Sequence, residues 1–89
     1  DVTEAELAEA YEDAYGEEAF IRMRTAPPNV KHCRDTNFCD LFPALVERGD
    51  GDRRVVVFST IDNMIKGASG QAVQNLNLMF DLPETMGLI

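Results

Sequence analysis

One junction in the sequence restricts the fold more than any other feature. The apolar run RVVVFSTI at 54–61 passes without a break into a segment of helical periodicity. Because successive positions of the run are apolar, it predicts a strand that is covered on both faces and central in its sheet. From position 64 to about position 80, apolar residues recur at helical spacing, and Asp62 is a suitable N-cap. The chain must therefore place a helix directly at the end of a strand.

The N-terminal segment predicts a second helix. Thr3 and Glu6 fit a capping box, apolar residues then recur at helical spacing over 4–15, and Gly16 follows the last turn. Half of the 16 acidic residues lie within positions 1–18, and we interpret them as a solvated helix face. The net charge of −8 argues against nucleic acid and anionic membranes as partners.

Two further extended segments are predicted between these helices. AFIRM at 19–23 is a short strand candidate, and the stretch 36–48 is apolar and mostly extended. Pro43 within that stretch indicates an edge position or a bulge, because proline cannot donate to a sheet ladder. RGDGDR at 48–53 predicts a hairpin turn, so the segments on either side of it are expected to pair antiparallel.

The resulting fold class is α+β, with an antiparallel sheet of about three strands flanked by an N-terminal and a C-terminal helix. The 89 residues allow one domain. No apolar stretch approaches the roughly 20 residues that span a bilayer, so we expect no membrane partner. The sequence opens on Asp1 within a predicted helix start, which suggests a segment of a longer protein.

The stretch KHCRDTNFCD gathers potential metal ligands and nucleophiles: His32, Cys33, Asp35, Cys39 and Asp40. A structural zinc site needs a second ligand pair elsewhere, and the sequence supplies none. A nucleophilic pair is also disfavoured, since neighbouring side chains in an extended segment point to opposite faces. We therefore expect free thiols in a reducing cytoplasm, with no metal ligand and no catalytic residue in this chain.

The opening of the second helix holds Lys66, Gly67 and Gly70. Each glycine costs roughly 1 kcal/mol in a helix interior relative to alanine. A cation at this end opposes the helix dipole. The pattern fits a flat ring or an anion held against the first turns, and it fits equally well a close contact with a neighbouring domain.

The segment STIDNMIKGASGQAVQNLNLMFDLPETMGL closely resembles the C-terminal signature of N-acetyl-gamma-glutamyl-phosphate reductases. That signature reads approximately acidic-Asn-Leu-x-Lys-Gly-Ala-Ala-Gly-Gln-Ala-Val-Gln-Asn. VKHCRDTNFCD and EEAFIRM resemble two strand regions of the same family, so the likeness covers residues 3 to 88. The chain departs from the pattern at LFPALV, at Cys33 in place of valine, and at Asp35 and Asp81 in place of glycine.

The resemblance implies an NADP-dependent reductase of arginine biosynthesis. It would convert N-acetylglutamyl 5-phosphate, a small acyl phosphate, to N-acetylglutamate 5-semialdehyde in the cytoplasm, as a homo-oligomer. Residues 1–89 would be the C-terminal part of a catalytic and dimerisation domain like that of glyceraldehyde-phosphate dehydrogenase. Residues 62–89 would form the helix and tail that pack toward an NADP-binding domain in the remainder of the enzyme. The nucleophilic cysteine would lie upstream, so this chain alone is expected to be inactive.

The resemblance also implies cofactor-binding residues. Asn63 would hydrogen-bond the nicotinamide carboxamide, Gly67 would allow close approach of the backbone, and Lys66 would lie near substrate or cofactor charge. Gln71 and Gln74 would hold the helix against its neighbouring domain. Two alternatives stay open, the homologous aminoadipyl-phosphate reductase of lysine biosynthesis and a stand-alone interaction domain without catalysis.

Overall fold

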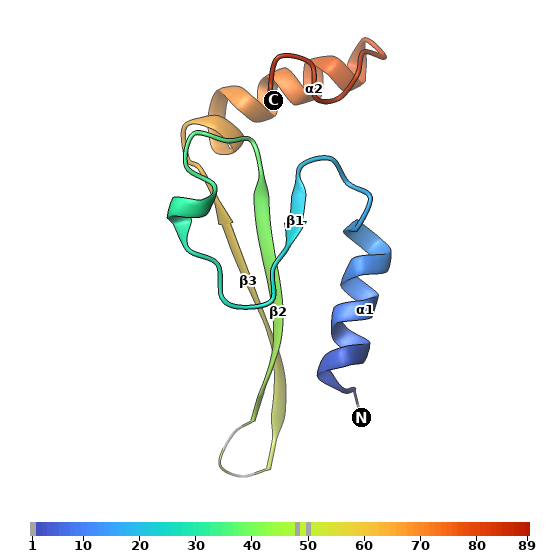
Figure 1. The fold of residues 1–89 in the computed structure, drawn as a ribbon, viewed down its shortest axis with the longest axis vertical. Helices are drawn as coiled ribbons and strands as arrows, with labels where there is room; N and C mark the ends of the chain where they lie inside the picture. Colours follow the sequence, from blue (N-terminus) through green and yellow to red (C-terminus); the bar gives the residue numbers. More distant parts are fainter. Residues whose placement is uncertain (1, 48, 50) are drawn as a thin grey trace.

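The computed structural model describes residues 2–47, 49 and 51–89. The elements in chain order are helix α1 (Glu4–Tyr15), strand β1 (Ile21–Met23), the 3₁₀ turn η1 (Val30–His32), strand β2 (Cys39–Glu47), strand β3 (Arg53–Ile61), the π-helical turn η2 (Ile65–Ser69) and helix α2 (Gly70–Met79). Figure 1 shows α1 beside the sheet and α2 across the end of the sheet where β3 finishes. The predicted α+β class, with a helix at each end of the chain, is confirmed.

The three strands form one sheet in the order β1-β2-β3. Strands β2 and β3 pair antiparallel along their whole length, from Cys39 opposite Ile61 to Glu47 opposite Arg53, which confirms the predicted hairpin. Of its predicted turn, Arg48 and Asp50 lie outside the described residues.

The prediction of an antiparallel sheet is wrong for β1, which runs parallel to β2 with Ile21 opposite Cys39. A parallel pair needs a crossover of about a dozen residues or more. Residues 24–38 provide it, passing through η1 before they enter β2.

The predicted order of the strands is also wrong, since β2 is central and β3 lies at an edge. Pro43 in β2 is tolerated because β1 ends at Met23. The last bond on that side runs from the Arg24 N–H to the Leu41 carbonyl. Alternate residues of a strand direct their backbone groups to the same side, so the nitrogen of Pro43 faces a side that β1 no longer covers. The strand is locally an edge there, and its register stays continuous without a bulge.

Very little of the described chain is buried. Among the described residues the buried hydrophobic side chains are Phe20 and Cys33, while Val55 in the middle of the apolar run is 51% exposed. The radius of gyration is 15.4 Å, against about 12 Å for a compact domain of this length. Strand β3 is apolar on both faces, yet Val55, Val56, Val57 and Phe58 stay 37–51% exposed within the described part of the chain.

The N-terminal helix matches its prediction. The Glu6 N–H donates to Thr3 Oγ1 at 3.1 Å, so Thr3 is the N-cap, and Gly16 follows the last turn. No residue of α1 is buried. Within the described part of the chain, neither helix is long and apolar enough to cross a membrane.

Two aspartates occupy backbone conformations that favour glycine. Asp35 has φ of 60° and Asp81 has φ of 56°. These are the two positions at which the resemblance leads us to expect glycine. Asp81 directly follows α2, and the next N–H, of Leu82, donates back to the Asn77 carbonyl at 2.8 Å. A left-handed residue just past a helix end allows this type of closing bond, so Asp81 ends α2 as a glycine would.

Candidate functional site

The junction between β3 and the following turn is organised by the carboxylate of Asp62. Its Oδ1 accepts the N–H groups of Met64 at 2.8 Å and Ile65 at 3.0 Å, and its Oδ2 accepts the N–H of Asp35 at 2.8 Å. These bonds, that from Asp35 foremost, hold the pKa of Asp62 below its usual value, and Arg34 acts in the same direction. Asp62 thus accepts N–H groups at the start of the turn as the predicted N-cap would, although the residue directly before η2 is Met64. The carboxylate also binds the loop that precedes β2.

The helix after this cap does not begin as an α-helix. Instead of the single helix predicted from about position 64, the structure has a π-helical turn over Ile65–Ser69 and then α2. The N–H groups of Gly67 and Ser69 donate to the carbonyls five residues earlier, those of Asp62 and Met64. Single π-helical turns of this kind occur often at functional sites.

The two glycines of this segment have different surroundings. A Cβ on Gly70 would lie 2.3 Å from Asn37 Oδ1 and 2.6 Å from the Ile65 carbonyl oxygen, so internal packing excludes a side chain there. A Cβ on Gly67 would meet its nearest described neighbours at 3.5 Å or more, an ordinary contact distance. Packing within the described chain therefore explains Gly70 and gives no reason for Gly67.

The structure brings two of the three predicted cofactor-binding residues together. Asn63 is exposed, its side chain makes no hydrogen bond to another described residue, and its Oδ1 lies 3.6 Å from where a Cβ of Gly67 would stand. Lys66 is turned inward, with Nζ donating to Gln74 Oε1 at 2.5 Å and lying 5.5 Å from the centre of the Phe20 ring. Asn63 and Gly67 thus form one exposed surface, from which the Lys66 ammonium is withdrawn.

A polar cluster behind this surface was missed by the sequence analysis. Asn37 Nδ2 donates to Gln74 Oε1 at 2.9 Å, and Gln74 Nε2 donates to Glu84 Oε2 at 2.6 Å. Asn37 is 1% exposed, and its Oδ1 has no hydrogen-bond partner among the described residues. The available signal was the spacing of Lys66, Gly70 and Gln74, which places them on one helical face.

The candidate metal ligands of the KHCRDTNFCD stretch are separated. Cys33 is buried and lies 3.6 Å from Thr60 Oγ1, whereas Cys39 lies 3.4 Å from Ser59 Oγ. Successive strand residues point to opposite faces, so the two thiols lie on opposite sides of the sheet. No group of three or more metal-binding side chains is found within residues 2–47, 49 and 51–89.

Asp40 has a structural partner set that the sequence analysis did not foresee. Its fully buried carboxylate accepts Arg22 Nε at 2.7 Å and Arg24 Nη2 at 3.1 Å. The guanidinium of Arg22 also donates to the His32 carbonyl and lies 4.4 Å from the centre of the Phe38 ring. These contacts fasten the crossover 24–38 to one face of the sheet.

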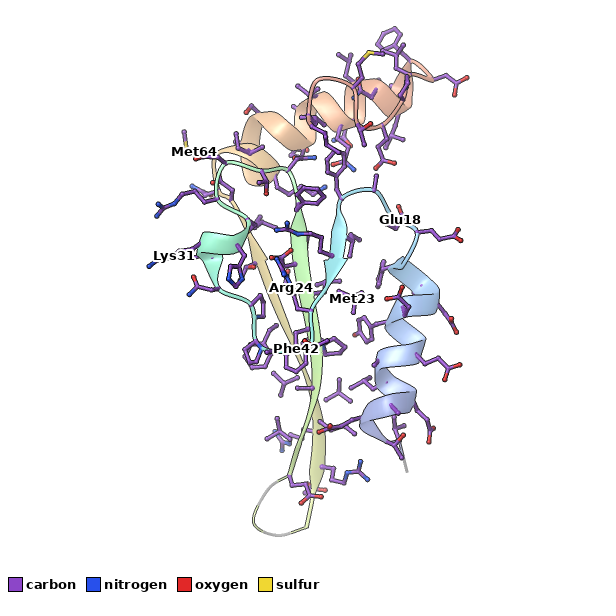
Figure 2. The ribbon with its side chains drawn as sticks, in the orientation of Figure 1. Glu18, Met23, Arg24, Lys31, Phe42 and Met64 are labelled. Atoms are coloured by element: carbon purple, nitrogen blue, oxygen red, sulfur yellow. The ribbon has the colours of Figure 1, made fainter. Side chains whose placement is uncertain are left out.

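A groove of about 630 Å³ separates α1 from the sheet. Its apolar lining comes from both sides, namely Ala5 and Ala8 of α1 and Met23, Phe42, Pro43 and Ala44 of β1 and β2. Arg24 and three glutamates of α1 also line the groove, and Figure 2 labels Met23 and Phe42 on the sheet beside α1. Helix α1 therefore covers the sheet incompletely.

Comparison with known proteins assigns this architecture. The family described as the semialdehyde dehydrogenase dimerisation domain matches residues 1–63, the part that holds α1 and all three strands. The chain belongs to this family.

Relatives of this dimerisation domain cover nearly the whole chain. The N-acetyl-gamma-glutamyl-phosphate reductase of Brevibacillus brevis is 47% identical over 99% of this chain. Those of Geobacter sulfurreducens and Methanosarcina acetivorans are 51% and 47% identical over 97% and 93% of it. The chain spans about a quarter of the length of these relatives. The resemblance to this reductase family is confirmed.

Proposed function

We propose that this chain is the C-terminal part of an NADP-dependent reductase of arginine biosynthesis. The whole enzyme reduces N-acetylglutamyl 5-phosphate to N-acetylglutamate 5-semialdehyde in the cytoplasm. The relatives that support this bear the name N-acetyl-gamma-glutamyl-phosphate reductase and match nearly the whole chain at 41–51% identity. The observation that carries the role of this segment is the exposed pair formed by Asn63 and Gly67 at the opening of η2.

The residues at this opening fit the nicotinamide end of NADP. A primary amide such as Asn63 offers both a donor and an acceptor, which are the two groups needed to pair with a carboxamide. Gly67 leaves backbone bare where the described chain has no internal need for it. When bound, NADPH supplies the hydride that reduces the acyl group. Asn63 then orients the ring, and Gly67 lets it lie against the backbone.

Lys66 has a less direct part in this proposal. Its ammonium is bound to Gln74 and lies near the Phe20 ring. Because the ammonium is withdrawn from the surface of Asn63 and Gly67, its positive charge acts on cofactor or substrate charge at a distance and not by contact. The chain contributes no catalytic residue, so the nucleophile belongs to the remainder of the enzyme, together with the NADP-binding domain toward which residues 62–89 pack.

The test is Asn63→Ala in the intact enzyme, with Asn75→Ala as the matched control. Asn75 is exposed on α2 and its side chain donates to Gln71. We expect Asn63→Ala to lower kcat/KM for NADPH about tenfold, as the loss of one or two hydrogen bonds to a ligand would. Asn75→Ala should change it less than twofold. Equal kinetics in both variants would remove Asn63 from the cofactor site.

The same assays separate the alternatives. Reduction of the aminoadipyl phosphate in preference to the glutamyl phosphate would assign the chain to the lysine-pathway enzyme. An intact protein that neither binds NADPH nor reduces either acyl phosphate would favour a non-catalytic interaction domain.

A second role is favoured by the bare strand β3. The family's description as a dimerisation domain and the exposure of Val55, Val56 and Val57 support pairing of this sheet with a second copy of the chain. The substitution Val55→Asp would bury a charge at such an interface and should convert the intact enzyme to a smaller species in sedimentation velocity. Val30→Asp is the control, because Val30 is 64% exposed in η1, outside the strands. A Val55→Asp enzyme of unchanged size would exclude this face from the interface.

A further inference from the structure

The side chain of Gln74 joins α2 to three other parts of the chain. Its Oε1 accepts from Asn37, in the loop before β2, and from Lys66 of η2. Its Nε2 donates to Glu84, in the segment after α2. Gln74 itself belongs to α2. One amide therefore uses both of its ends to bind the loop, the π-helical turn and the tail to the helix.

The contacts around this amide leave little freedom for the turn. Asn37 is 1% exposed, and its Oδ1 occupies the space that a Cβ would need on Gly70, the first residue of α2. Lys66 lies between Gln74 and the Phe20 ring, and Phe20 is 1% exposed. The tail is held as well, since Asn77 Nδ2 donates to the carbonyls of Glu84 and Met86. Figure 1 shows this tail running back along α2.

The charges around Gln74 match the two ends of its amide. Lys66 and Glu84 carry opposite charges and contact opposite ends of the same neutral amide. An amide is suited to this position because its oxygen accepts from the ammonium and its nitrogen donates to the carboxylate. A leucine of similar size would supply neither bond and would leave Asn37 Nδ2 and the Lys66 ammonium without their acceptor.

We propose that Gln74 is a positioning residue for the η2 turn. By fixing Lys66 and Asn37 on its oxygen and Glu84 on its nitrogen, it holds the turn in the single orientation in which Asn63 and Gly67 form one surface. This inference rests on the proposed function for its link to NADPH, but the ordering of the turn by Gln74 can be measured without any cofactor.

The experiment uses four variants of the intact enzyme. Gln74→Leu removes both amide ends, and Gln71→Leu is its control, since Gln71 is exposed one turn earlier and its oxygen accepts from Asn75. Gln74→Glu keeps the acceptor for Lys66 but sets a carboxylate against Glu84, at the 2.6 Å contact that Gln74 now donates. Adding Glu84→Gln to it reverses the pair and restores a donor to that contact.

Two measurements are made on each variant. The first is amide hydrogen exchange of residues 62–69 without cofactor. We expect exchange about tenfold faster in Gln74→Leu and Gln74→Glu, and rates within about twofold of the parent in Gln71→Leu and in the double variant. The second is kinetics, in which Gln74→Leu should raise KM for NADPH about tenfold while kcat changes less than threefold.

The outcomes separate this inference from the proposed function. Faster exchange in Gln74→Leu, with rescue by the double variant, supports the positioning role, even if Asn63→Ala shows that this surface does not bind NADPH. If Asn63→Ala weakens NADPH binding while Gln74→Leu behaves like Gln71→Leu in both measurements, the positioning role is overturned. A double variant that exchanges as fast as Gln74→Glu also overturns it, because the charge arrangement would then be irrelevant.

Discussion

The backbone N–H of Asp35 donates to Oδ2 of Asp62 over 2.8 Å, which joins the crossover before β2 to the turn that follows β3. The same carboxylate binds the N–H groups of Met64 and Ile65 through its other oxygen. A single ionised group thus fixes the two segments that flank the proposed cofactor surface.

This arrangement predicts a pH dependence. The pKa of Asp62 is lowered in the folded chain, so the folded state binds this proton less readily than the unfolded state. The stabilisation by Asp62 is therefore complete above about pH 4, near the ordinary pKa of aspartate, and is lost as the pH falls through the lower folded value. In thermal unfolding of the intact protein, Asp62→Asn should lower Tm at neutral pH, and the difference should shrink below about pH 4. A difference independent of pH, or one equal to that of the exposed Asp13→Asn control, would contradict this.

Asp81 supplies a stability prediction of the opposite sign. Its φ of 56° is costly for a residue with a Cβ, so Asp81→Gly should stabilise the intact protein by about 0.5–1 kcal/mol. The matched control is Asp13→Gly within α1, which should destabilise by about 1 kcal/mol. Urea unfolding of both variants measures the contrast, and a destabilising Asp81→Gly would show that the aspartate side chain has a compensating contact.

Substituting the two glycines, Gly67 of η2 and Gly70 of α2, should have different effects on stability and on NADPH binding. Gly70→Ala places a Cβ 2.3 Å from Asn37 Oδ1, and we expect it to destabilise the protein by about 1–3 kcal/mol. Gly67→Ala meets ordinary contact distances and should change stability by less than about 0.5 kcal/mol while weakening NADPH binding. Thermal unfolding measures the stability of each variant, and NADPH titration measures its affinity for the cofactor. A Gly67→Ala enzyme with unchanged NADPH affinity would mean that no ligand approaches this backbone.

Asp40 should be the most sensitive carboxylate of the described residues. Replacing it by asparagine leaves the shape but removes the charge that Arg22 and Arg24 share. Both arginine side chains are about one-third exposed and keep some solvation, so we expect a loss of about 2–3 kcal/mol rather than the larger cost of a fully buried pair. Urea unfolding measures it against Asp13→Asn, an exposed control. Equal stability of the two variants would show that the arginines gain nothing from the carboxylate.

Local signals predicted most of the elements correctly. The capping pattern at Thr3 and the glycine at position 16 predicted the bounds of α1. The apolar segments on either side of 48–53 predicted the β2–β3 hairpin. These features depend on residues that are close in sequence, where capping and turn chemistry decide the outcome. The Asp62 cap was likewise predictable from its place between an apolar run and a helical period.

The strand order was not predictable in the same way. A run such as 54–61 is apolar on both faces whether its cover comes from the same chain or from another surface, so composition cannot distinguish a central strand from an exposed one. The parallel pairing of β1 depends on the path of the crossover 24–38, which no short-range pattern encodes.

The candidate site also contains residues that the sequence predicted and residues that only the fold brings together. Asn63 and Gly67 were predicted as cofactor-binding residues through the family signature, and in the structure Asn63 Oδ1 lies 3.6 Å from where a Cβ of Gly67 would stand. Gln74, Asn37 and Glu84 meet only through tertiary folding, so sequence reasoning assigned Gln74 to a neighbouring domain when its partners lie within this chain.

Within the described residues, one edge of β3 pairs with no other strand, and this has a consequence for aggregation. From Val55 to Phe58 it presents an apolar stretch beside a row of free backbone groups, which is the usual starting point for aggregation. Two arginines, Arg53 and Arg54, stand at the beginning of that strand. Positive charges at this position oppose the stacking of one exposed strand edge on another, as charged residues beside an apolar strand do in other proteins.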